Sequence, residues 1–147
     1  MGKFLAESSF ITAILCWFIA QVLKVIFVLI KDRKIDFSRF IGSGGMPSSH
    51  SAFVMGLATA IGFTKGFSSD IFAVSAVLAL VVMYDAAGVR RAAGEQAKIL
   101  NQMVEEWGSQ NFKNTEVRLK ELLGHTPLQV FAGAILGILI AVLRHLG

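Results

Sequence analysis

Long apolar stretches separated by short polar segments constrain this chain more than any other feature. They cover about residues 10–30, 47–64, 71–87 and 126–143. Three are long enough to cross a bilayer and one is marginal, because a membrane-spanning helix needs about 17–25 mainly apolar residues. Only 16% of the residues are charged, against about a quarter in a soluble domain. We therefore predict an all-α integral membrane protein with four transmembrane helices, forming a single domain over residues 1–147.

The polar segment between the third and fourth spans has an amphipathic pattern. Its apolar residues form one helical stripe: Ile99, Leu100, Met103, Val104 and Trp107. A break follows at residues 108–114, and a second short helix is predicted over residues 116–123, ending at Gly124. The pattern predicts a helical hairpin lying in the membrane interface, from about Val89 to Leu123.

An even number of spans brings several polar residues to one side of the membrane. The end of the first span, the start of the second, the end of the third and the start of the fourth must share that side. The residues expected to converge there are Lys31, His50, Asp85, Arg90, Arg91 and His125. This convergence follows from the topology alone.

The distribution of positive charge predicts the orientation. Ten of the 14 Lys and Arg residues lie on this shared side, in segments 31–39 and 90–120, and three lie on the other side. The positive-inside rule then places the shared side in the cytoplasm, with the protein in the cell's inner (plasma) membrane. Part of the excess could instead serve an anion site, and with a net charge of +4 the expected partners are anionic lipids, not nucleic acid.

The stretch of residues 42–51, GSGGMPSSHS, is the strongest functional motif. Its glycines leave backbone amides uncovered, and Pro47 is expected where the second span begins. Gly45, Ser48, Ser49 and His50 would then lie around a helix N-terminus, whose free N–H groups and partial positive charge suit a phosphate. The simpler alternative is a flexible turn with Ser48 as a helix cap.

Lys24 lies inside the first span, where a charge is costly. Gln21, Lys24 and Lys31 share one helix face. Such a lysine usually faces an interior or a water-filled cavity, which predicts a phosphate-binding role for Lys24 and Lys31. Alternatively, Lys24 could extend along the helix to the membrane interface.

The last span opens with His125-Thr126-Pro127, a second proline-led helix start with a histidine beside it. Because the unperturbed pKa of histidine is about 6.5, two histidines could divide the roles of nucleophile and general acid in phosphate ester cleavage. Cations and amides would hold the phosphate oxygens. The sequence has no cluster of carboxylates that would indicate a metal site. Cys16 is the single cysteine, so there is neither a disulfide framework nor a cysteine metal cluster. Neither a metal nor another cofactor is therefore expected.

Three blocks resemble a known family: GGMPSSHSA at 44–52, YDAAGVRR at 84–91 and LLGHTP at 122–127. They are similar to the divergent bacterial and plant branch of the type 2 phosphatidate phosphatase and vanadium haloperoxidase superfamily. PSSH at 47–50 resembles the superfamily's second signature, usually Pro-Ser-Gly-His, and His125 resembles the histidine of its third. The resemblance covers nearly the whole chain.

The resemblance implies that His125 is a nucleophile that forms a phosphohistidine and that His50 protonates the leaving alkoxide. In the superfamily an aspartate orients the nucleophilic ring, but its position here is Gln129, and an expected arginine is replaced by Leu119. The first signature's lysine and arginine correspond in spacing to Lys24 and Lys31. From topology, Asp85 is a candidate substitute carboxylate, and Arg90 and Arg91 are candidate substitute cations.

Two functions follow as hypotheses. One is a metal-independent lipid phosphatase acting on phosphatidate, phosphatidylglycerophosphate or a prenyl mono- or diphosphate. The other is a non-catalytic protein that binds or transports anionic lipids, an alternative favoured by Gln129 and Leu119.

Small residues repeat on the second span at Ala52, Gly56 and Ala60, and on the fourth at Gly133 and Gly137. Such faces allow close helix packing, and a homodimer is therefore expected.

Overall fold

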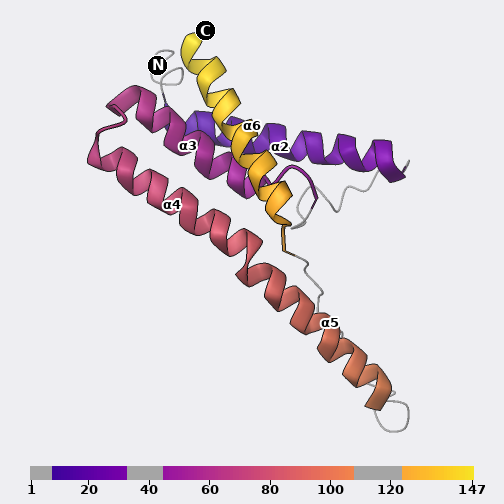
Figure 1. Ribbon diagram of the computed structural model, residues 1–147. Coiled ribbons are helices and arrows are strands. Elements are labelled where there is room, and N and C mark those ends of the chain that lie inside the picture. Colours follow the sequence, from indigo (N-terminus) through magenta and orange to yellow (C-terminus); the bar gives the residue numbers. More distant parts are fainter. Residues whose placement is uncertain (1–7, 33–44, 108–123) are drawn as a thin grey trace.

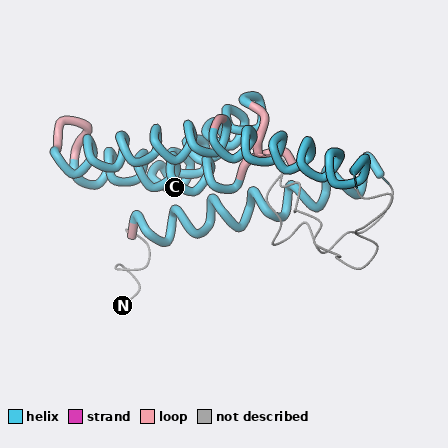
Figure 2. The backbone as a smooth tube through the Cα atoms, turned by 90° about the horizontal axis from the view of Figure 1, so that it is seen from below, coloured by secondary structure: helices cyan, strands magenta, loops and turns pink. Residues whose placement is uncertain are grey.

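The computed structural model describes residues 8–32, 45–107 and 124–147. Regular structure in these ranges is entirely helical, with short loops between the helices (Figures 1 and 2). The helices are α2 (Ser9–Asp32), α3 (Ser49–Lys65), α4 (Asp70–Ala87), α5 (Val89–Trp107) and α6 (Pro127–Leu146). The predicted all-α class is confirmed.

Side-chain caps set the starts of three helices. Ser48, Ser69 and Thr126 are the N-caps of α3, α4 and α6, and each accepts a backbone N–H from the first turn of its helix. Pro127 is the first residue of α6, as its sequence position predicted. The prediction for Pro47 is wrong, because Pro47 precedes the cap Ser48 and lies outside α3.

Helix α3 lies at the centre of the bundle and packs against α2, α4 and α6 (Figure 1). Close contact with α6 depends on two glycines. A Cβ atom at Gly133 would collide with the backbone carbonyl of Ser48, and one at Gly137 with that of Ala52. The small-residue faces of both helices therefore pack against each other within one chain. Because these faces are used for packing within one chain, they do not support a homodimer. The homodimer stays a prediction.

By length and composition, three helical segments can cross a membrane: Ser9–Ile30, Asp70–Met103 and Pro127–Leu146. The predicted fourth span is not confirmed. It corresponds to α3, whose 17 residues would extend about 26 Å at 1.5 Å per residue, short of a hydrocarbon core of about 30 Å. Its buried positions are mostly small or hydroxylated residues enclosed by neighbouring helices.

Contacts at the two ends of the bundle fix its topology. At one end, the Ser9 hydroxyl lies 3.3 Å from that of Thr64, so α2 begins where α3 ends. The ring of His145, near the end of α6, stacks on Phe63 of α3. The end of α2, the start of α3, the end of α4 and the start of α6 lie at the opposite end, which we call the histidine end.

Helix α5 follows α4 after a break at Gly88 and extends away from the other helices (Figure 1). Three residues of its predicted apolar stripe, Ile99, Leu100 and Met103, are about half exposed. The first helix of the predicted hairpin is therefore present, with its stripe uncovered by the part of the chain that the structure describes. The second, residues 116–123, lies outside the described residues.

Candidate functional site

The two histidines singled out by the sequence lie side by side at the histidine end. The ring centroids of His50 and His125 are 6.2 Å apart, and the planes meet at 60°. His50 is the second residue of α3 and is exposed, whereas His125 precedes the Thr126 cap of α6 and is only 3% exposed. The predicted convergence of these two residues is confirmed.

Backbone hydrogen bonds join three elements around the histidines. The N–H of His125 donates to the carbonyl of Ala86 in the last turn of α4, at 3.1 Å. The N–H of Ser48 donates to the carbonyl of Gln129 in α6, at 3.0 Å. These bonds hold the starts of α3 and α6 in a fixed relation and so bring the two histidines to one place.

The ring of His125 has a side-chain partner that the sequence reasoning missed. Its Nδ1 lies 3.3 Å from Oε1 of Gln129. The same oxygen accepts the N–H of Thr126 at 3.1 Å, while the Thr126 hydroxyl accepts the N–H of Gln129 at 3.3 Å. This is a capping box, and the spacing Thr-x-x-Gln at a helix start was the signal that could have revealed it.

Ser48 and Ser49 are buried at the start of α3, at 0% and 2% exposure. The Ser48 hydroxyl accepts the N–H of Ser51 at 3.4 Å and the Ser51 hydroxyl at 3.0 Å. Because its hydroxyl accepts the first-turn N–H of Ser51, Ser48 is the helix cap that the simpler alternative expected, and its own N–H is bonded to Gln129. Ser49 is the first residue of α3.

Lys24 is 1% exposed, and its ammonium donates to Oε1 of Gln21 at 2.7 Å. Its side chain does not extend to the membrane interface, so that alternative is wrong. Gly45 has a φ of +89°, and a Cβ there would come within 3.0 Å of Cγ of Lys24. Glycine thus permits both the backbone conformation and the close approach of a buried cation to the loop before α3.

The remaining predicted residues reach the histidine end through their positions in the chain. Lys31 is the next-to-last residue of α2, and Arg90 and Arg91 lie in the first turn of α5. Asp85 is half-buried in the last turn of α4, one residue before the carbonyl that binds His125. The side chains of Lys31, Arg90 and Arg91, like residues 42–44 and Leu119, lie outside what the structure describes.

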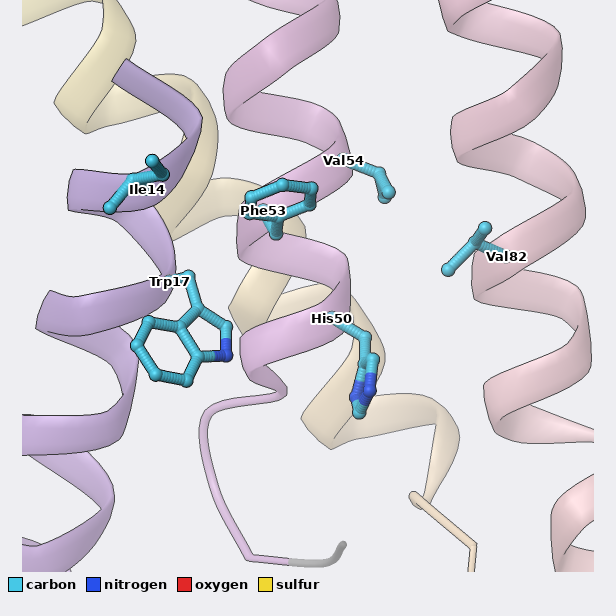
Figure 3. Close-up of a pocket in the computed structure, with 6 residues that line it drawn as sticks. All are labelled: Ile14, Trp17, His50, Phe53, Val54 and Val82. Carbon is cyan, nitrogen blue, oxygen red and sulfur yellow. The ribbon is translucent and has the colours of Figure 1, made fainter. Parts of the chain in front are cut away.

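An apolar cavity of about 410 Å³ adjoins His50. Helices α2, α3 and α4 all contribute to its wall (Figure 3). It is lined by Ile14, Trp17, His50, Phe53, Val54 and Val82. An imidazole at the side of a hydrocarbon-lined cavity suits a ligand with one polar and one apolar part.

Comparison with known proteins identifies the family of the chain. A family model described as the Divergent PAP2 family matches residues 5–140. Over 131 residues the chain is 46% identical to the "Uncharacterized membrane protein YuiD" of Bacillus subtilis (strain 168), a match that covers 82% of this chain and 83% of that protein. No solved structure matches the chain. With three helices able to span a bilayer, the chain is a multi-pass membrane protein that belongs to the Divergent PAP2 family.

Proposed function

We propose that this protein is a metal-independent phosphatase that hydrolyses a lipid phosphate through a phosphohistidine. One observation carries the proposal: the 6.2 Å approach of His50 and His125 from two helix starts. A nucleophile in position to react lies about 3–3.5 Å from the atom it attacks. Two imidazoles this close to each other can both reach one phosphoryl group bound beside them, one as the nucleophile and the other as the proton donor.

In the proposed reaction, Nε2 of His125 forms a bond to phosphorus and the bond from phosphorus to the lipid oxygen breaks. His50 gives its proton to that oxygen, which leaves as the lipid alcohol. His50 then takes a proton from a water molecule that attacks the phosphohistidine, and inorganic phosphate is released. Each turnover consumes one water and restores both histidines.

The proposed phosphate ligands are the cations and amides of the histidine end. Lys24 supplies a buried positive charge beside Gly45, and Lys31, Arg90 and Arg91 are further candidate cations. The N-terminus of α3, with Ser48 and Ser49, contributes the positive end of its helix dipole. Such groups stabilise the charge that develops on the oxygens in the transition state. The cavity beside His50 would hold the apolar part of the lipid that lies next to its phosphate.

Phosphate release by the purified full-length protein tests the proposal. The protein would be assayed in mixed micelles with phosphatidate, phosphatidylglycerophosphate and a prenyl phosphate, each in the presence of excess chelator. We expect release from at least one lipid at a rate that the chelator leaves unchanged. Absence of release from all three, with the protein folded, would contradict the proposal.

A non-catalytic protein that binds or transports anionic lipids is the second candidate. Gln129 and Leu119 favour it, because they stand where catalytic relatives are expected to carry an aspartate and an arginine. This function predicts saturable binding of phosphatidate vesicles without phosphate release. It also predicts that His125→Ala leaves turnover undetectable, as in the unaltered protein, while binding changes little.

We further propose that the histidine end faces the cytoplasm, because the excess of Lys and Arg lies on that side. An Asn111→Cys variant tests this orientation, since Cys16 is buried and should stay unlabelled. An impermeant thiol reagent added to intact cells should fail to label position 111, and should label it after the cells are broken. Labelling in intact cells would place the histidine end outside.

A further inference from the structure

We propose that Gln129 positions His125 for reaction by holding the ring proton on Nδ1 and leaving the lone pair on Nε2. The orientation of the His125 ring follows from the capping box alone. The importance of that orientation for turnover rests on the function proposed above. Gln129 would thereby take the place of the aspartate expected at this position, and it would do so without adding a negative charge.

The Thr126 N–H determines which atom of the Gln129 amide faces His125. Oxygen and nitrogen of a glutamine amide are assigned from their hydrogen-bond partners. A backbone N–H can only donate, so the atom 3.1 Å from it must be the oxygen. The same atom lies 3.3 Å from Nδ1 of His125. A flipped amide would bring two donors together at the Thr126 contact.

An amide oxygen can only accept, so Nδ1 of His125 must donate its proton to Gln129. In a neutral imidazole only one nitrogen carries a proton, which leaves the other with its lone pair. That other nitrogen is Nε2, the atom proposed to attack phosphorus. The capping box therefore selects the nucleophilic tautomer of the ring and fixes its orientation at the same time.

Among the described residues, three other titratable groups lie at the histidine end. The His50 ring is 6.2 Å from that of His125, Asp85 stands one residue from Ala86, whose carbonyl accepts the His125 N–H, and the Lys24 ammonium is buried beside Gln21. None of them alters the geometric argument, because the Gln129 oxygen already accepts from Nδ1. A neutral acceptor orients the ring but favours the positively charged imidazolium less than a carboxylate would. His125 should therefore stay neutral to a lower pH than in a Gln129→Glu variant.

The experiment compares three variants of the full chain in detergent micelles with ¹⁵N-labelled histidine. Gln129→Leu removes the acceptor, and Gln129→Glu keeps the shape, the capping box and the acceptor while adding a charge. Thr126→Ala removes the hydroxyl half of the capping box but leaves the Thr126 N–H, and so controls for loss of the helix cap. NMR signals of His125 are identified by their absence in His125→Asn.

We expect His125 to show the Nδ1-protonated tautomer in the unaltered protein, in Thr126→Ala and in Gln129→Glu, and a mixture of tautomers in Gln129→Leu. With phosphatidate as substrate, Gln129→Leu should lower kcat about 100-fold, the effect of a misplaced reacting group, with little change in KM. Gln129→Glu should retain kcat at high pH and move the acidic limb of its pH profile upward by about one unit, because the added charge favours imidazolium.

An Nε2-protonated His125 in the unaltered protein, or a tautomer unchanged in Gln129→Leu, would overturn the inference. Equal loss of activity in Thr126→Ala and Gln129→Leu would also overturn it, since Gln129 would then act only through the helix cap. Failure of the proposed function gives a different result. The tautomers would follow the expected pattern while the unaltered protein released no phosphate.

Discussion

The starts of α3 and α6 look alike in sequence and differ in structure. Each has a proline, a hydroxyl-bearing cap and a histidine within four residues. In α3 the histidine follows the cap, so His50 lies on the first turn and is exposed beside the apolar cavity. In α6 the histidine precedes the cap, so His125 is buried and bonded through its backbone to Ala86 and through its ring to Gln129.

This difference assigns different tasks to the two rings. A nucleophile benefits from a fixed position and a defined tautomer, which burial and the capping box give to His125. A general acid must exchange protons with the leaving group and with water, which the exposure of His50 allows. The position of each histidine relative to its helix cap thus separates a held imidazole from an accessible one.

The largest expected effect is that of His125→Ala. If the held imidazole is the nucleophile, its removal abolishes turnover, because binding interactions alone cannot replace the covalent intermediate. Phosphate release from phosphatidate measures this effect. His145→Ala at the opposite end of α6 is the matched control and should keep its activity. Substantial residual turnover in His125→Ala would contradict the assignment.

His50→Ala should have the next largest effect. Loss of general acid catalysis lowers turnover typically about 10²–10⁴-fold. Single-turnover release of the alcohol isolates this step from hydrolysis of the phosphohistidine, in which His50 has its second proposed role. In that measurement the defect should be far smaller with nitrophenyl phosphate, whose leaving group departs without a proton. Equal single-turnover defects with both substrates would mean that His50 does not act as the acid.

Lys24→Met should weaken the site to a lesser extent. The methionine fills the same buried space but removes the charge proposed to bind a phosphate oxygen. Hydrogen bonds to charged groups contribute about 1.5–3 kcal/mol, so kcat/KM should fall about 10- to 150-fold. Lys65→Met, at an exposed position at the other end of α3, is the matched control. Equal activity of the two variants would exclude Lys24 from the site.

Asp85→Asn should have the smallest effect. Asp85 is half-buried, and charge interactions in partly solvated positions contribute about 1 kcal/mol or less. Turnover should therefore fall about fivefold, with the thermal midpoint of unfolding little changed. A loss as large as that of Gln129→Leu would instead make Asp85 the main orienting group for His125.

The sequence predicted the parts of this molecule that depend on periodicity and topology. Apolar stretches located the helices to within a few residues, and the expected alternation of helix direction along the chain brought His50 and His125 together. The sequence was less informative where a side chain could form hydrogen bonds with more than one partner. Pro47 lies before the cap because Ser48, with a hydroxyl that can accept a first-turn N–H, takes that place. Gln129 was interpreted as a missing aspartate, although its spacing from Thr126 predicts a capping box that turns its oxygen toward His125.

Trapping of the covalent intermediate tests the central claim most directly. The full-length protein, His50→Ala and His125→Ala would each be mixed with ³²P-labelled phosphatidate and quenched under conditions that preserve phosphohistidine. A ³²P-labelled nitrophenyl phosphate would be used in parallel, because its leaving group needs no acid. The account predicts label on the unaltered protein with both substrates, on His50→Ala with nitrophenyl phosphate, and none on His125→Ala. Label retained in His125→Ala but lost in His50→Ala would reverse the two roles. Full activity without label in all three proteins would contradict a histidine nucleophile altogether.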